Sequence, residues 1–372
     1  MKENLLKKLE TLGQSIWIDY FRRELIASGE LRCLVEEDGL RGLTSNPSIF
    51  ENAIAESQIY DHYIHELSRQ KKDVKAIYET LSQLDVQNAA DEFRNLYEKT
   101  DGENGYVSLE INPHLAHDTK GTIEEARRLW TALNRPNVLI KVPATSDCLP
   151  AIQQLISEGI NVNVTLLLGL PRYRQVAEAY IAGLEERAAH KRPLKHIASV
   201  ASFFLSRIDS LMDPLVEKFL EQGGEKTEIA KKVHGQIAIA SAKAAYQIFK
   251  ETFGSSRFKK LTDKGALVQR LLWASTSTKN PDYSDIKYIE SLIGPDTVNT
   301  VPLKTIDAYR DHGDPKSRLE QNVEEANWVI ARLPELGINI DKVTQQIEDE
   351  GIKKFEESFD KLMESLTKKS SE

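Results

Sequence analysis

A lysine at the centre of an apolar run is the residue of this sequence that points most directly to chemistry. Lys141 lies within residues 138–145, a run that is otherwise almost wholly apolar. Because prolines bound it at Pro136 and Pro143, the run predicts a buried strand. Since a buried ammonium ion is costly, Lys141 either extends its head group to solvent or gives up its proton more readily than usual. The neutral amine is a nucleophile that forms a Schiff base with a carbonyl substrate.

Carboxylates interrupt or close other apolar runs. Glu110 stands between Leu109 and Ile111, where an acid needs a buried partner. It is either a proton-transfer group or the ion-pair partner of Lys141 on the neighbouring strand. Asp19 closes an earlier run, and it is either a second catalytic carboxylate or the cap of the helix that follows.

Amides, hydroxyls and an arginine follow further runs. Asn46 is either a substrate ligand or a turn residue. Asn163 and Thr165 share one strand face, where they either face a site or satisfy polar layers of the core. Arg207 follows a run that contains Ser202, and it either binds a phosphate or pairs with a neighbouring acid on a helix surface. With a lysine nucleophile and carboxylates that carry protons, this set suits Schiff-base chemistry on a phosphorylated polyol.

Short β-branched runs alternate with longer helical patterns, which is typical of a parallel α/β protein. The expected strands are residues 15–20, 42–48, 106–112, 138–145, 160–166, 196–204, 267–275 and 297–301. Eight strands, each followed by helix, predict a closed (β/α)8 TIM barrel, in which the C-terminal strand ends carry the catalytic groups. The competing architecture is a doubly wound open sheet, but no Gly-rich dinucleotide fingerprint follows any of these strands.

The helices that should surround this barrel follow from the same alternation. They are residues 22–37, several helices within 48–99 with a break near 71–73, 119–134 with Thr119 or Thr122 as N-cap, 147–157, 171–189, and a long helical span over 208–253. The tail over 342–366 has an apolar stripe and predicts an amphipathic helix or pair of helices broken at Gly351. We therefore expect residues 1–372 to form one barrel domain with this tail as a helical extension.

Composition limits the class of protein. A net charge of -8 argues against nucleic acid or an anionic membrane as the main partner. No apolar run approaches the ~18 residues that span a bilayer, and the N-terminus lacks the apolar region of a secretory signal. The chain has 2 cysteines, Cys33 and Cys148, which fits a reducing compartment, so a cytoplasmic location is expected.

Several motifs together resemble the transaldolase family in its longer form. Residues 42–50 (GLTSNPSIF) match its first signature, and residues 139–145 (LIKVPAT) match the second, which contains the Schiff-base lysine. Residues 107–110, 163–166 and 202–207 also align with family segments, within a resemblance that covers roughly residues 13–313. The resemblance implies an αβ barrel related to class I aldolases.

The resemblance also implies a role for each candidate residue. Lys141 would attack the ketone of a ketose phosphate and form an imine. Glu110, working through a water held by Thr165, would carry protons, and Asp19 would take the proton of the C4 hydroxyl as the C3–C4 bond breaks. The remaining candidates would bind substrate: Asn46, Asn163 and Ser202 the hydroxyls, Arg207 the phosphate, and Phe204 the wall of the pocket. Shorter family members carry a second phosphate-binding arginine after the seventh strand; residues 273–280 have none, so Lys279 or nearby hydroxyls would replace it.

The expected function is therefore that of a transaldolase of the pentose phosphate pathway, with sugar phosphates as substrates. Two alternatives stay open: an aldolase that acts on fructose 6-phosphate and releases dihydroxyacetone, and a sugar-phosphate-binding barrel without turnover. No cofactor is expected, because imine chemistry needs none, and His114 and His117 lack a third ligand that would complete a metal site. We expect a monomer or a homodimer.

Overall fold

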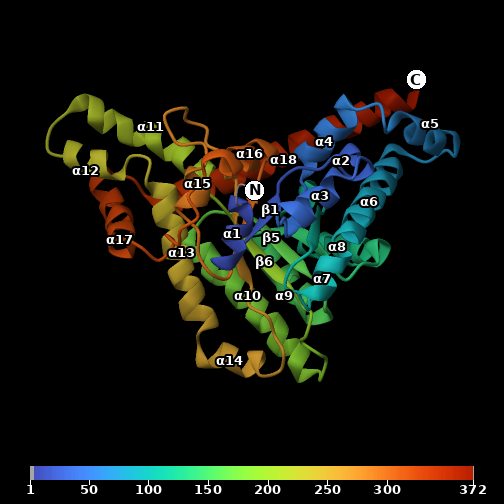
Figure 1. The fold of residues 1–372 in the computed structure, drawn as a ribbon, viewed down its shortest axis with the longest axis horizontal. Coiled ribbons are helices and arrows are strands. Elements are labelled where there is room, and N and C mark those ends of the chain that lie inside the picture. Colours follow the sequence, from blue (N-terminus) through green and yellow to red (C-terminus); the bar gives the residue numbers. More distant parts are fainter. Residues whose placement is uncertain (1–3, 372) are drawn as a thin grey trace.

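The computed structural model describes residues 4–371, and its centre is a closed barrel of parallel strands in the order β1 to β8 (Figure 1). The strands are β1 Gln14–Ile18, β2 Gly42–Leu43, β3 Tyr106–Glu110, β4 Val138–Pro143, β5 Val162–Leu167, β6 Ser199–Phe204, β7 Arg270–Ala274 and β8 Thr297–Val301. The barrel closes where β1 pairs with β8. This confirms the predicted (β/α)8 barrel and excludes the open sheet.

The strand register brings three polar residues to one level of the barrel. Glu110 on β3 lies opposite Lys141 on β4, and Lys141 lies opposite Asn163 on β5. Every residue of β3, β4 and β5 is buried, as expected for parallel strands that helices cover from outside. The apolar residues of these strands therefore fix a lysine and a carboxylate side by side near their C-terminal ends.

Helices cover the outside of the barrel. They are α1 Leu5–Thr11, α2 Arg23–Ala27, α3 Glu30–Glu37, α4 Pro47–Glu56, α5 Asp61–Arg69, α6 Val74–Glu92, α7 Arg94–Lys99, α8 Thr119–Leu133, α9 Leu149–Glu158, α10 Leu170–Ala189, α11 Ser206–Gln222, α12 Thr227–Val233, α13 Ile237–Phe253, α14 Ser256–Thr262, α15 Lys287–Glu290, α16 Leu303–His312, α17 Val323–Arg332 and α18 Ile340–Ser371. Short 3-10 helices lie at Pro113–Leu115, Ser146–Cys148 and Leu333–Leu336. The expected break near 71–73 is present between α5 and α6. Within the described part of the chain, no helix combines the length and apolarity that a membrane crossing requires.

The start of α8 differs from the prediction. Asp118, rather than Thr119 or Thr122, is the N-cap, and its carboxylate accepts a hydrogen bond from the N–H of Gly121 at 2.9 Å. The Thr122 hydroxyl instead donates to the carbonyl oxygen of Leu115, and the Thr119 hydroxyl also donates to a backbone carbonyl. Either threonine was a reasonable cap by type, but tertiary hydrogen bonds engage both.

The predicted break at Gly351 is wrong, because α18 is one continuous helix of 32 residues. Figure 1 shows this helix, in red, running beside α4 towards α5. A Cβ atom at Gly351 would lie 2.9 Å from Nη1 of Arg207 and 3.0 Å from the side chain of Leu166. The glycine therefore lets α18 approach the barrel closely and does not interrupt the helix.

Candidate active site

A cavity of about 260 Å³ lies at the C-terminal ends of the strands. It is lined by most of the residues that the sequence singled out: Asp19, Asn46, Lys141, Thr165, Ser202, Phe204, Arg207 and Lys279. Glu110 and Asn163 do not line it but lie directly behind residues that do. Side chains from β4, β5 and β6 and from the segments after β1, β2, β6 and β7 thus converge on one space.

Lys141 lies within contact distance of an acid and a backbone carbonyl. Its side chain is almost fully buried, and Nζ lies 3.1 Å from Oε2 of Glu110. Nζ also donates a hydrogen bond to the carbonyl oxygen of Ser45 at 3.2 Å. The ion pair that was one interpretation of Glu110 is therefore present, and it leaves the amine at the cavity wall.

Glu110 is held in a setting that favours its protonated form. Burial raises the pKa of the Glu110 carboxyl, and the nearby Lys141 ammonium opposes that rise. Both carboxylate oxygens are buried, and no group of residues 4–371 donates a well-aligned hydrogen bond to either. The hydroxyl of Thr165 is likewise buried and unpartnered within those residues. Apart from the ion pair of Glu110 Oε2 with Lys141, these atoms keep hydrogen-bonding capacity that residues 4–371 do not use.

Asp19, the residue after β1, lines the same cavity. Its carboxylate accepts a hydrogen bond from the hydroxyl of Thr44 at 2.8 Å. Burial raises the pKa of Asp19, against the lowering effects of Lys141, the Thr44 hydrogen bond, Arg207 and, less strongly, Lys279. Asp19 does not cap the next helix, since α2 begins after Arg22.

Asn163 positions another residue of the cavity. Its amide oxygen accepts a hydrogen bond from the Ser202 hydroxyl at 2.7 Å, and its nitrogen donates to the Ser108 hydroxyl at 3.0 Å. Asn46 has two roles that the sequence left as alternatives, because its side-chain oxygen caps α4 through the N–H of Ile49 while the residue also lines the cavity.

Arg207 enters the cavity between two aromatic rings. Its guanidinium carbon lies 4.9 Å from the ring centre of Phe204 and 5.6 Å from that of Phe355. The alternative of a helix-surface pair with Asp209 is wrong, because Asp209 accepts hydrogen bonds from Lys287 and other groups instead. In the described part of the chain Arg207 forms no ion pair, so its charge is available to an anion.

Lys279 supplies a second positive charge to this cavity. Its Nζ donates a hydrogen bond to the hydroxyl of Ser277 at 2.9 Å, and both residues line the cavity wall. Residues 273–280, which follow the start of β7, contain no arginine, and Lys279 is their cationic residue at the cavity.

Among the residues that sequence reasoning missed, Thr44 and Phe355 contact proposed catalytic groups. Thr44 belongs to a recognised motif, but nothing in its type shows that it contacts Asp19. Phe355 appeared only as part of the apolar stripe of the tail, yet it lines the cavity. Its ring centre lies 5.8 Å from Nζ of Lys141. No local signal distinguishes Phe355 from the other apolar residues of that stripe.

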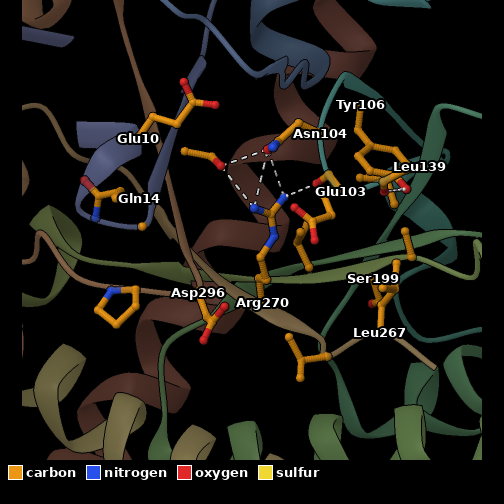
Figure 2. A pocket seen from close by; sticks show the side chains of 17 residues that line it. Glu10, Gln14, Glu103, Asn104, Tyr106, Leu139, Ser199, Leu267, Arg270 and Asp296 are labelled. Atoms are coloured by element: carbon orange, nitrogen blue, oxygen red, sulfur yellow. Dashed lines mark hydrogen bonds between the residues drawn. The ribbon is translucent and has the colours of Figure 1, made fainter. Parts of the chain in front are cut away.

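A second cavity, of about 310 Å³, lies at the opposite end of the barrel (Figure 2). There Arg270 donates hydrogen bonds to the Ser15 hydroxyl at 3.0 Å and to the carbonyl oxygen of Glu103 at 2.7 Å. No lysine lines this cavity within the part of the chain that the structure describes. Of these two cavities, the one at the C-terminal strand ends is therefore the one that offers a lysine.

The two histidines considered as metal ligands have separate partners. Nε2 of His114 lies 2.8 Å from Oδ1 of Asp360, and Nδ1 of His117 lies 2.9 Å from Oδ2 of Asp147. Among residues 4–371 no group of three or more histidine, cysteine or acidic side chains is placed to hold a metal ion.

Comparison with known proteins assigns this barrel to a family. A family model described as transaldolase/fructose-6-phosphate aldolase matches residues 16–366. The chain belongs to this family. A protein named Transaldolase from Trichodesmium erythraeum is 51% identical over 373 residues, which cover 99% of this chain and 98% of that protein. Transaldolase 2 from Nostoc punctiforme is 48% identical over 374 residues (99% and 98% coverage), and Transaldolase from Thiobacillus denitrificans is 45% identical over 363 residues (98% and 99%).

The family resemblance that the motifs indicated is thus confirmed over nearly the whole chain. The chain is an enzyme of the transaldolase and fructose-6-phosphate aldolase family, and its fold is the barrel described above.

Proposed function

We propose that this enzyme transfers a dihydroxyacetone unit from sedoheptulose 7-phosphate to glyceraldehyde 3-phosphate, giving erythrose 4-phosphate and fructose 6-phosphate in the pentose phosphate pathway. The observation that carries the proposal is a buried lysine at a cavity wall, with Nζ of Lys141 3.1 Å from Glu110. The name Transaldolase, shared by relatives at 41 to 51% identity, agrees with it.

The first step is attack of the Lys141 amine on the ketone carbon of the donor. A carbinolamine forms, and loss of water from it gives the imine. Glu110 would supply the proton for the departing hydroxyl and take protons back on hydrolysis, with the Thr165 hydroxyl holding the water that connects it to the substrate. The raised pKa of Glu110 suits this exchange, since a carboxyl that keeps its proton longer serves as acid as well as base.

Carbon–carbon cleavage is the second step. The carboxylate of Asp19 would take the proton of the C4 hydroxyl, the C3–C4 electron pair would move towards the imine, and the aldose phosphate would leave. The remaining three-carbon enamine stays on Lys141 until an acceptor aldehyde arrives and the same steps run in reverse. Asp19 suits this role because its carboxylate lines the cavity directly after β1, where the Thr44 hydroxyl holds it by a hydrogen bond.

Binding of the donor would use both polar and charged groups of the cavity. Ser202 and Asn46 would hold hydroxyls, with Asn163 fixing the orientation of Ser202. Arg207 and Lys279 would bind the phosphate, because both positively charged side chains line the same cavity. A guanidinium with two aromatic rings beside it has little freedom, which favours a fixed phosphate position.

The direct test is product analysis with purified enzyme. With fructose 6-phosphate and erythrose 4-phosphate, the proposal expects sedoheptulose 7-phosphate and glyceraldehyde 3-phosphate in equal amounts. Free dihydroxyacetone as the main product would instead make the enzyme a fructose-6-phosphate aldolase. Absence of any product from correctly folded protein would leave only the sugar-phosphate-binding barrel.

Glu110→Gln should slow imine formation about 100-fold, because the amide cannot exchange the proton that dehydration of the carbinolamine requires. The rate of borohydride trapping of fructose 6-phosphate on the enzyme measures this step. Glu125→Gln is a matched control, since Glu125 accepts a backbone hydrogen bond from Asn112 outside the cavity, which glutamine also accepts. An unchanged trapping rate in Glu110→Gln would remove Glu110 from the proton path.

Thr44→Val should shift the acid limb of the pH–rate profile to higher pH. The Thr44 hydrogen bond stabilises the charged form of Asp19 and lowers its pKa, so its loss raises that pKa further. More Asp19 is then protonated at a given acidic pH and cannot act as a base, which moves the limb up by about one unit. A pH profile of kcat/KM measures the shift, and Thr44→Ser, which keeps the hydroxyl, should show none. A Thr44→Val profile that overlays the native one would separate Asp19 from the acid limb.

We also propose that the whole chain acts as one domain, with α18 as a part of the barrel assembly, because α18 is in contact with α4, α5, α6 and β5.

We further propose a cytoplasmic location, which agrees with the proposed substrates and with the free thiols of both cysteines. The monomeric or homodimeric state stays a prediction.

A further inference from the structure

The C-terminal helix supplies one side chain to the cavity. Of the residues of α18, Phe355 alone lines it, with a side chain that is only 5% exposed. Its ring centre lies 5.8 Å from Nζ of Lys141 and 5.6 Å from the guanidinium carbon of Arg207. An apolar ring therefore lies close to both the proposed nucleophile and the cation proposed to bind phosphate.

Contacts on both sides of Phe355 fix its position. Towards the N-terminus of α18, Gly351 lets the helix lie against Arg207. Towards the C-terminus, the hydroxyls of Ser48 and Ser358 form a hydrogen bond at 2.7 Å, and Phe359 packs edge-on against Tyr78 with ring centres 5.5 Å apart.

The far end of α18 is tied to the body of the protein as well. Lys369 forms an ion pair with Asp61 on α5 at 2.7 Å and donates a hydrogen bond to the carbonyl oxygen of Ser57. Leu362 and Leu366 are fully buried. The helix is held at several points, so the ring of Phe355 is a fixed part of the cavity wall.

A transferase of this kind must protect its intermediate. If a proton from water or an acid adds to the enamine carbon, an iminium forms, water adds at its C2 carbon, and free dihydroxyacetone leaves with regeneration of the lysine amine. That sequence consumes the donor without transfer. Release of dihydroxyacetone by this route needs water beside the enamine on Lys141. The ring of Phe355 takes up part of the space in which such water would lie.

We propose that Phe355 is a specificity-determining residue that favours transfer over release of dihydroxyacetone by excluding solvent water, other than the one water held by Thr165, from the enamine on Lys141. This inference rests on the proposed function, because it concerns the fate of the enamine in that reaction. The ring acts by volume and apolarity, and it takes no part in proton transfer.

Phe355→Ala should raise the ratio of free dihydroxyacetone to transfer product about tenfold, the change that a barrier difference of about 1.4 kcal/mol produces. The ratio is measured with fructose 6-phosphate and erythrose 4-phosphate as substrates, alongside borohydride trapping on Lys141. Phe355→Leu, which keeps part of the volume, should shift the ratio in the same direction by less, and it serves where the alanine variant folds poorly.

Leu362→Ala is the matched control, because it removes a buried side chain of the same helix that lines no part of the cavity. It should lower the melting temperature and leave the product ratio as in the native enzyme. An equal rise in Leu362→Ala and Phe355→Ala would overturn the inference and make the effect one of helix docking. An unchanged ratio in both Phe355 variants would overturn it too, whereas lack of trapping and transfer in the native enzyme would refute the proposed function itself.

Discussion

Replacing Lys141 by methionine should abolish turnover and remove the borohydride-stable adduct. Methionine is unbranched and of similar length, so it fills the same place in β4 but offers no amine to the ketone. Glu110 then loses its ion-pair partner, and its raised pKa allows it to become neutral rather than remain a buried charge. The expected loss of kcat is on the order of a millionfold, as for removal of a covalent nucleophile. Transfer assays and peptide mass mapping after reduction measure both effects.

The control for this variant is a lysine buried elsewhere. Lys243 on α13 is 8% exposed and donates to the carbonyl oxygen of Gln321, away from the cavity. Lys243→Met should keep native turnover and a native adduct on Lys141. An adduct of full yield on some other lysine in Lys141→Met would contradict the assignment of the nucleophile.

Asp19→Asn should block carbon–carbon cleavage and leave imine formation intact. Asparagine has the shape of aspartate and still accepts the Thr44 hydrogen bond, but it cannot take the proton of the C4 hydroxyl. The expected fall in kcat is roughly 100- to 10,000-fold, the usual contribution of a general base. The variant should therefore accumulate the imine of the uncleaved donor.

The mass of the trapped adduct separates the two steps. After reduction in the presence of fructose 6-phosphate, Asp19→Asn should carry the entire six-carbon phosphate on Lys141, whereas the native enzyme should also carry the three-carbon unit. Thr44→Ser keeps the hydroxyl that binds Asp19 and should give the native mixture. A three-carbon adduct in Asp19→Asn at the native rate would show that another group removes the proton.

The barrel could be predicted because its strands are local features. Each apolar run is short and ends at a polar or turn residue, so the run 138–145 locates β4 at Val138–Pro143 without knowledge of any neighbour. The polar residues at the run ends share one mouth because all strands are parallel. That rule alone placed Lys141, Asp19 and Arg207 together.

The parts that could not be predicted depend on contacts between distant residues. Phe355 reaches Lys141 only because α18 folds back over the barrel, and no periodicity in the tail contains that information. Gly351 suggested a break because glycine weakens helices, but close approach to Arg207 decides its role. Asn163 shows the same limit, because its orientation towards Ser108 and Ser202 depends on the neighbouring strands.

The position of Phe355 has a consequence for protein synthesis. The ribosome delivers β8, which closes the barrel, well before it delivers α18. A nascent chain can therefore complete its barrel while the wall beside Lys141 is still missing, for a time on the order of ten seconds at ordinary rates of elongation. During that interval Lys141 is less enclosed than in the complete fold, in which the ring of Phe355 lines the cavity beside it.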